Sequence, residues 1–256
     1  MHADSPLLPA AGLLHTRAET CAPAFWQGGA AGLRPAHLHE FHAREAGDAA
    51  AAAGLVAAVA IGVSGPTVWL RARRGGSAEA TAGAVIHGAG WAELGGAPGH
   101  CLFVLAEDAK ALLRSGLDAV RSGGARVVVI EARGRMPELD LTASRRLALA
   151  AGDANVLLLV LRSEADRAPS AAWTRWAVAS APSRPLEANA PGLPAFDIEL
   201  LRHRAGPAGA RWRLEWDRDR REFRDPGEPA LPGAVVSAPF GGALAAGSGG
   251  QRRRVA

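Results

Sequence analysis

Apolar and polar positions alternate in two different rhythms along the chain, and each rhythm predicts one kind of element. Between residues 36 and 161, short apolar runs predict strands at 36–41, 68–70, 102–105, 126–130 and 156–161. Helices are predicted at 48–61, 109–122 and 142–152, with a weaker one around 90–95. Unbroken β-branched runs such as 127–130 are typical of central strands covered on both faces. The repeated alternation of strand and helix favours a parallel sheet with right-handed crossovers.

The rhythm changes in the last third of the chain. Short alternating segments at 176–181, 196–204 and 212–216 are separated by Pro and Gly turns, which predicts antiparallel hairpin strands added to the sheet edge. From residue 225 onward the chain is rich in Pro, Gly and Ala and buries little, so this part is expected to be disordered. The pattern therefore predicts an N-terminal extension (1–29), one core domain (30–224) and a tail with a basic end (225–256).

Composition supports a packed core without identifying a ligand. The chain has 256 residues, of which 48% are hydrophobic, and a net charge of +4. Arginine supplies almost all of the positive charge, because Lys110 is the only lysine, and such a mild excess is weak evidence for a nucleic-acid partner. Cys21 and Cys101 lie far apart and match no metal-binding or disulfide spacing.

The sequence favours a cytoplasmic protein that does not associate with a membrane. The N-terminus lacks a basic segment followed by a long apolar stretch, so it is not read as a signal peptide. The apolar run 49–63 is shorter than the roughly 18–20 residues that span a bilayer. A reducing compartment also fits the two isolated cysteines.

The stretch HEFHAREAGDAAAAAGLVAAVA, residues 39–60, has the strand–turn–helix order of a phosphate-binding loop. Such a loop reads G-x-x-x-x-G-K-[ST], where lysine reaches the phosphates and the hydroxyl binds magnesium. Here Gly47 is followed by Asp48 and Ala49, and His42 stands where the first glycine belongs. A carboxylate at this place repels an anionic ligand, so neither a nucleotide cofactor nor ATP hydrolysis is expected. Asp48 is instead predicted to cap the helix that follows.

A residual acid follows the fourth predicted strand. Strand 126–130 is followed by Glu131, where phosphate-loop enzymes place an acid that helps to hold magnesium. A charged residue also commonly marks the point where a buried strand leaves the core. This structural interpretation of Glu131 is preferred, because the other residues of a magnesium and phosphate site are absent.

The histidines around Glu40 raise the question of a metal site. His37, His39 and His42 lie on a predicted strand rather than a helix and lack the H-E-x-x-H spacing. Alternation places His37 and His39 on one face, with Glu40 and His42 on the other. Packing histidines are therefore expected, with no metal. No catalytic nucleophile arrangement can be nominated either.

Two clusters combine arginine with tryptophan, RAPSAAWTRW (167–176) and LLRHRAGPAGARWRLEWDRDRREFR (200–224). Arginine and tryptophan suit phosphate pairing and base stacking, and they suit protein interfaces equally well. A hairpin with a solvated arginine face and buried tryptophans explains them as well. The contact candidates, for a protein partner or DNA, are Arg202, Arg204, Arg211 and Trp212, together with Arg252, Arg253 and Arg254 in the tail.

The order of these pieces resembles a RecA-type ATPase core of the phosphate-loop class. GLRPAHLHEFHAREAGDAAA occupies the place of that family's phosphate loop, and TVWLRARR resembles the strand that carries its catalytic glutamate. More closely, GDAAAA, LDLTASRRLALAA, TRWAVASAPS, FDIELLRHRAGPAG and WRLEWDRDRREF are similar to ImuA, a family of SOS-induced accessory proteins of mutagenic translesion synthesis that is related to SulA. The resemblance covers about residues 30–220.

The resemblance implies a non-catalytic RecA paralogue in the DNA damage response. Its expected partners are an ImuB-like Y-family protein, an error-prone C-family DNA polymerase and RecA itself, near the nucleoid. Departures from RecA bear on mechanism: the catalytic glutamate position falls near Arg71 or Arg73, and the DNA-binding loops correspond to the short segments RGRMPELD and SEADRAPS. The sequence does not decide whether the protein binds DNA directly, and any such binding is expected to be weak.

Two other functions stay open at this point. The first is a DNA-dependent ATPase with an atypical loop, whose turnover would depend on Glu131. The second is a SulA-like inhibitor of cell division, which would cause filamentation on overexpression. The full set of hairpin strands favours the mutagenesis role over the second alternative.

Overall fold

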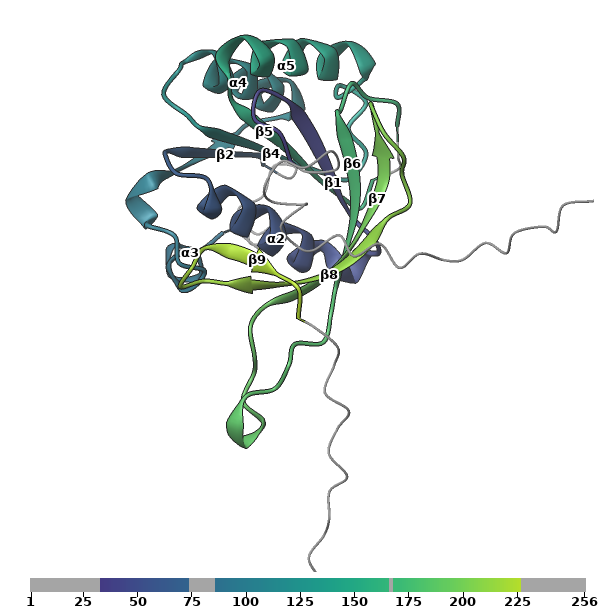
Figure 1. The fold of residues 1–256 in the computed structure, drawn as a ribbon. Helices are drawn as coiled ribbons and strands as arrows, with labels where there is room; N and C mark the ends of the chain where they lie inside the picture. The colour runs from purple at the N-terminus through teal and green to yellow at the C-terminus, as the bar shows by residue number, and fades with distance from the viewer. Residues whose placement is uncertain (1–32, 74–85, 166–167, 227–256) are drawn as a thin grey trace, which may run out of the picture. The chain divides into compact units, whose positions relative to one another are not determined.

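The computed structural model describes residues 33–73, 86–165 and 168–226. Within these residues nine strands form a single sheet in the order β3-β2-β4-β5-β1-β6-β7-β8-β9 (Figure 1). The strands are β1 (Leu38–Ala43), β2 (Thr67–Ala72), β3 (Cys101–Ala106), β4 (Val127–Arg133), β5 (Leu157–Ser163), β6 (Thr174–Ser180), β7 (Ala195–His203), β8 (Arg211–Asp217) and β9 (Glu222–Arg224). The α-helices are α2 (Ala49–Gly62), α3 (Gly88–Glu93), α4 (Ala109–Arg121) and α5 (Leu141–Ala154), and the 3-10 turns are η1 (Ala46–Asp48), η3 (Pro98–His100) and η4 (Glu187–Asn189).

The strands from β3 to β6 in this order pair in parallel, and β7, β8 and β9 continue the sheet as antiparallel strands. The predicted class, a mostly parallel α/β sheet with antiparallel C-terminal strands, is confirmed. The pattern predicted only part of the pairing of β6. This strand was expected to pair with the antiparallel hairpin strands, and it does so with β7, but it also pairs in parallel with β1, with His39 beside Thr174. Alternation of apolar residues reports which face is buried and carries no information about strand direction.

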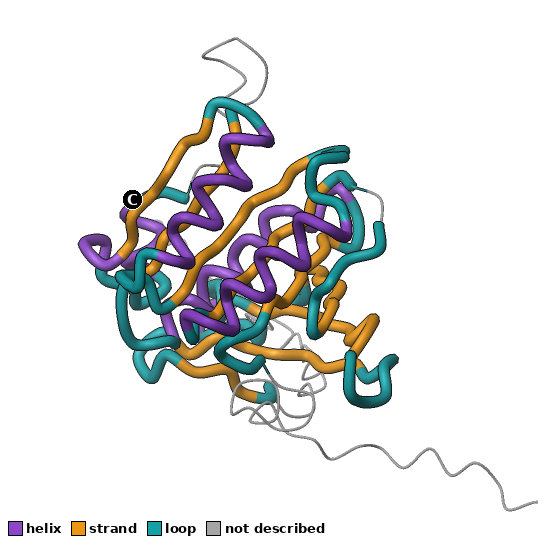
Figure 2. The backbone as a smooth tube through the Cα atoms, turned by 90° about the horizontal axis from the view of Figure 1, so that it is seen from above, coloured by secondary structure: helices purple, strands orange, loops and turns teal. Residues whose placement is uncertain are grey.

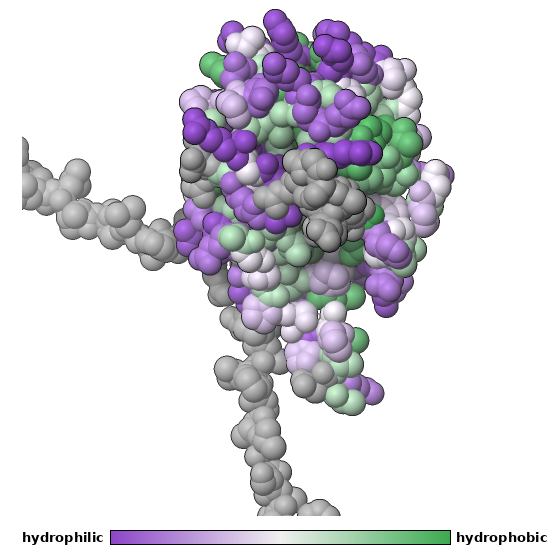
Figure 3. Space-filling model, turned by 180° about the vertical axis from the view of Figure 1, so that it is seen from behind, coloured by the Kyte–Doolittle hydropathy of each residue, from purple (hydrophilic) through white to green (hydrophobic). Residues whose placement is uncertain are grey.

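Helices cover both faces of the sheet. Helix α2 lies on one face, and α4 and α5 pack together on the other (Figure 1). Figure 2 shows the helices running alongside the strands that they cover. Seen from behind, the surface at the α4 and α5 end of the molecule is mainly hydrophilic (Figure 3). The parallel strands are thereby enclosed on both sides, which explains their continuous apolar sequence.

Local signals explain where the outer helices begin and end. Asp108 and Asp140 precede α4 and α5, and each carboxylate accepts a hydrogen bond of 2.7 Å from a backbone N–H of the first turn. Helix α5 ends at Asn155, whose φ of 54° is the left-handed conformation common after a helix. Helix α2 consists entirely of Ala, Gly, Leu, Val and Ile, so it has no polar face, and eight of its residues are buried.

Three fully buried tryptophans form the centre of the α2 side of the core, Trp69, Trp176 and Trp216. Each indole N–H has an acceptor: Trp69 donates to Glu131 at 3.1 Å, Trp176 to the Thr174 hydroxyl at 2.6 Å, and Trp216 to a backbone carbonyl at 2.9 Å. Large apolar rings whose polar atom is satisfied contribute area to the core without a buried unpaired donor.

The predicted extension 1–29 and tail 225–256 lie outside the described residues, apart from Asp225 and Pro226. None of the described helices is long and apolar enough to cross a membrane.

Candidate functional site

The connection between β1 and α2 stands where a phosphate loop would lie. The carboxylate of Asp48 accepts hydrogen bonds from the backbone N–H and the hydroxyl of Ser180, at 3.0 and 3.2 Å, and from the N–H of Glu45 at 3.2 Å. Ser180 ends β6, so Asp48 ties the turn to the neighbouring strand. This side chain was predicted to cap α2, but it makes no hydrogen bond to the first turn of that helix. The reason is that η1 runs directly into α2, and Asp48 closes the start of η1 instead.

The rest of this turn makes no use of glycine. A Cβ atom at Gly47 would meet no atom within 4 Å, and its φ is not in the left-handed region. Ala49 is the first residue of α2. A loop that wraps around phosphates needs glycine so that the backbone can approach the ligand closely. Nothing in the conformation of this turn requires that freedom.

Glu131 lies on β4, on the α2 face of the sheet. Its carboxylate accepts the Trp69 indole hydrogen bond at 3.1 Å. Arg71 occupies the facing position on β2, paired in register with Glu131, and its side chain is buried. The residual acid and the arginine that stands at the expected glutamate position are therefore neighbours, and the arrangement has the character of a structural contact.

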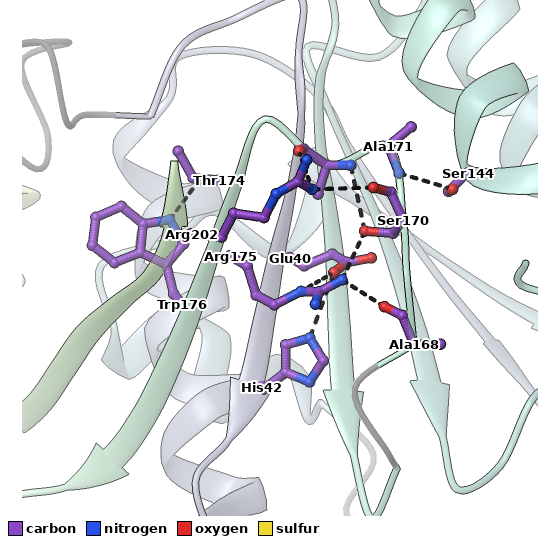
Figure 4. Close-up of polar contacts among 11 residues, drawn as sticks. Glu40, His42, Ser144, Ala168, Ser170, Ala171, Thr174, Arg175, Trp176 and Arg202 are labelled. Atoms are coloured by element: carbon purple, nitrogen blue, oxygen red, sulfur yellow. Dashed lines mark hydrogen bonds and ion pairs between the residues drawn. The ribbon is translucent and has the colours of Figure 1, made fainter. Parts of the chain in front are cut away.

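A buried charged cluster lies on the opposite face of β1 (Figure 4). Glu40 accepts a hydrogen bond of 2.8 Å from Nε of Arg175, and His42 Nε2 lies 3.5 Å from the same carboxylate oxygen. Arg162 of β5 is only 7% exposed and acts on Glu40 through its charge. One carboxylate thus faces two guanidinium groups and an imidazole in the interior.

Protonation in this cluster follows from the competition between burial and charge. Burial alone would raise the pKa of Glu40, but the contact with His42 and the charge of Arg175 together lower it below its ordinary value. Burial lowers the pKa of His42, and the nearby carboxylate only partly offsets this. At neutral pH the cluster therefore holds an ionised Glu40 and a neutral His42.

Strand alternation was expected to separate the histidines, and it does. His39 is buried on the α2 face, where Nδ1 lies 2.6 Å from the Thr174 hydroxyl and Nε2 lies 3.0 Å from the carbonyl of Arg34. His42 lies on the other face with Glu40, and His37 precedes β1. Across the described part of the chain, no group of three or more His, Cys, Asp or Glu is placed to hold a metal ion.

The two segments that the resemblance to RecA matches with DNA-binding loops are held to the core and to each other by side-chain contacts. Arg133 pairs with Glu164 at 2.6 Å, which joins the residues after β4 to those after β5. Met136 and Leu139 are buried, so the first segment folds down onto the sheet. The second segment falls partly on residues 166–167, which lie outside the described residues.

Two arginines hold the described part of the second segment (Figure 4). Arg175 donates to the carbonyl of Ala168 at 2.7 Å and to the Ser170 hydroxyl at 2.9 Å. Arg202 donates to the carbonyls of Ser170 and Ala172, at 3.1 and 3.5 Å. Four hydrogen bonds from two rigid guanidinium groups give residues 168–172 a defined conformation.

The residues predicted to contact a partner protein or DNA do not form one cluster, because they contact different parts of the described structure. Arg202 and Arg204 lie beside residues 168–173, where the N–H of Arg204 donates to the carbonyl of Trp173 at 2.9 Å. Arg211 pairs with Glu199 at 3.1 Å, and Trp212 packs against Trp176 with ring centroids 5.7 Å apart. Arg252, Arg253 and Arg254 lie outside the described residues.

Sequence reasoning missed the role of Glu40, Arg162 and Arg175. A signal was present, because Arg162 and Arg175 are charged residues in strands that otherwise read as apolar or small. A charge at a buried strand position needs a partner of opposite sign nearby, and Glu40 on β1 is the charged residue of the strand between them.

Comparison with known proteins identifies the fold but not the family or the function. No family model matches the chain, and a search of curated proteins found no match. Among solved structures, the crystal structure of the RadB recombinase is similar, with a TM-score of 0.50 and 14% sequence identity over 80% of this chain and 96% of that chain. At this identity the likeness shows the fold alone, and it agrees with the predicted RecA-like core.

Proposed function

We propose that this protein is a non-catalytic RecA-like adaptor of the ImuA type, which supports mutagenic translesion DNA synthesis after DNA damage. In this role it binds an ImuB-like Y-family protein and RecA, and acts through them with an error-prone C-family polymerase at the nucleoid. The sequence phrases similar to ImuA and the RecA-like fold support this assignment.

The observation that carries the proposal is the position of Asp48. In a working loop the helix N-terminus and a lysine attract the phosphates. Here a carboxylate precedes the helix and is already bonded to Ser180 and Glu45. A phosphate at this place would meet a like charge, and displacing that charge would break three hydrogen bonds. The geometry favours a scaffold that works without nucleotide chemistry.

The fastened loops support an adaptor over a filament that holds DNA. Single-stranded DNA binding needs a basic channel and exposed rings for base stacking. The two segments that correspond to DNA-binding loops are joined by the pair Arg133–Glu164 and held by Arg175. Side chains that lock the protein's own loops are not offered to DNA.

Nucleotide and partner binding by the purified full-length protein test the proposal together. Fluorescent ATP is titrated to millimolar concentration, with and without single-stranded DNA, and binding to an ImuB-like protein and to RecA is measured by co-purification. We expect no saturable ATP binding and a stable complex with at least one of the two proteins. Absence of both complexes would refute the adaptor role.

The same preparation separates the alternatives. ATP turnover that is lost in Glu131→Gln would support the ATPase instead. The matched control is Glu187→Gln, which changes an exposed carboxyl on η4, outside both loop segments. Equal loss in both variants would indicate a folding defect rather than a catalytic acid, and filamentation of cells on overexpression would support the SulA-like role.

A further inference from the structure

An open groove of about 400 Å³ lies between α5 and residues 168–173, away from the β1–α2 turn. Two of its lining residues, Leu141 and Leu149 on α5, are large apolar side chains that are 49% and 63% exposed. Apolar side chains exposed at a concave surface are typical of a binding site.

The helical wall of the groove has a regular pattern. Leu141, Arg145 and Leu149 follow one another at intervals of four residues, so they form one stripe along α5. Eight residues of helix separate the two leucines, a distance of about 12 Å at 1.5 Å per residue. The stripe therefore offers two apolar contacts with a cation between them.

The charge of the groove has a single sign. Its lining includes Arg145, Arg202 and Arg204 and contains no Asp or Glu among the described residues. Arg202 is held in place by its bonds to Ser170 and Ala172 (Figure 4). A groove of this charge complements an acidic ligand.

The wall opposite α5 is already ordered. The N–H of Ala171 donates to the Ser144 hydroxyl of α5 at 3.0 Å, and Arg175 donates to the carbonyl of Ala168 and the hydroxyl of Ser170 (Figure 4). A ligand therefore meets a preformed surface, and little ordering opposes its binding.

The aromatic contacts favour a peptide over single-stranded nucleic acid. The indole of Trp173 lines the groove, but His37 packs edge-on against it at 4.4 Å, His203 lies at 5.9 Å, and the Arg34 guanidinium lies 6.0 Å over the ring. Base stacking needs an open ring face. Leucine side chains on either side of a cation suit a carboxylate that is flanked by two apolar side chains.

We propose that this groove binds an acidic segment of a partner protein that carries two apolar side chains about 12 Å apart, which contact Leu141 and Leu149 while carboxylates pair with Arg145 and Arg204. The inference does not depend on the proposed function, because the groove is separate from the nucleotide-site counterpart.

The test uses the full-length protein and a fluorescein-labelled 12-residue peptide of glutamates and serines with two leucines four positions apart. An extended peptide places these leucines about 13 Å apart. We expect saturable binding by fluorescence anisotropy. Arg145→Glu should weaken it about tenfold or more, and Leu149→Ala about fivefold. The matched control Arg114→Glu, on the exposed surface of α4, should change it less than about twofold.

Two further probes make the result decisive. A peptide with lysines in place of glutamates should bind Arg145→Glu better than it binds the wild type, which a misfolded variant cannot do. A peptide with alanines in place of leucines should bind at least about fivefold more weakly than the parent. The proposal is overturned if the parent peptide does not bind, if Arg114→Glu weakens it as much as Arg145→Glu, or if an oligothymidylate competes for the groove and depends on Arg145.

Discussion

Acid should destabilise this protein through His39. The imidazole is fully buried, and both nitrogens have partners in the neutral form. Burial lowers the pKa of His39 from 6.5 to about 4, with smaller contributions from the nearby imidazoles of His37 and His203 and an opposing one from the backbone at Arg34. Folding therefore favours the neutral ring, and protons bind the unfolded chain more strongly.

The sign and size follow from linkage. A depressed folded-state pKa means that stability is complete above pH 6.5 and is lost as the pH falls towards about 4. The difference between the two values corresponds to about 3 kcal/mol in total, of which roughly 2 kcal/mol is lost between pH 7.5 and pH 5. Most carboxylates titrate below this window, so the histidines dominate it.

Urea denaturation followed by tryptophan fluorescence at pH 7.5, 6 and 5 measures this loss. His39→Gln lowers stability at every pH, but the decline between pH 7.5 and 5 should become shallower by about 2 kcal/mol. His100→Gln changes an exposed ring and should leave the decline as in the wild type. A decline in His39→Gln as steep as that of the wild type would refute the reasoning.

Three substitutions probe the remaining contacts. Glu40→Gln leaves the largely buried guanidinium of Arg175 without its counter-charge, so the free energy of unfolding should fall by about 3 kcal/mol at pH 7 in urea titrations, and a loss under about 1 kcal/mol would contradict the cluster's role. Asp48→Ala removes the bonds to Ser180, and thermal unfolding should show about 1 kcal/mol of destabilisation without any gain of ATP binding. Trp216→Ala opens a cavity in the α2 side of the core and should cost about 3–5 kcal/mol, measured by calorimetry, and an unchanged melting temperature would argue against this packing.

The elements of this fold were readable because their signals are local. The helix expected at 109–122 is α4 at Ala109–Arg121, and the strand expected at 126–130 belongs to β4 at Val127–Arg133. Periodicity within a dozen residues is enough for such assignments. The short strand β9 was missed because three residues show no periodicity.

The contacts of the candidate site were not readable, because their partners are distant in sequence. Asp48 and Ser180 are 132 positions apart, and Glu40 and Arg175 are 135 positions apart. No local pattern specifies which of several acids meets which arginine. Asp48 illustrates the consequence: the sequence suggested the common local role of a helix cap, and the structure shows a bond to another strand instead.

The connections that leave the carboxyl ends of β1, β4 and β5 are where α/β proteins of this kind bind ligands. In nucleotide-driven switches such segments are free to rearrange when the ligand changes. Here each of these connections is fixed by a side-chain contact with another part of the sheet: Asp48 bonds to Ser180, Arg133 pairs with Glu164, and Arg175 holds residues 168–170. Bonds of this kind lower the gain from any ligand that must displace them, and they keep the surrounding surface in one shape. These contacts support the proposal that the protein presents a constant surface to partner proteins rather than cycling between nucleotide states.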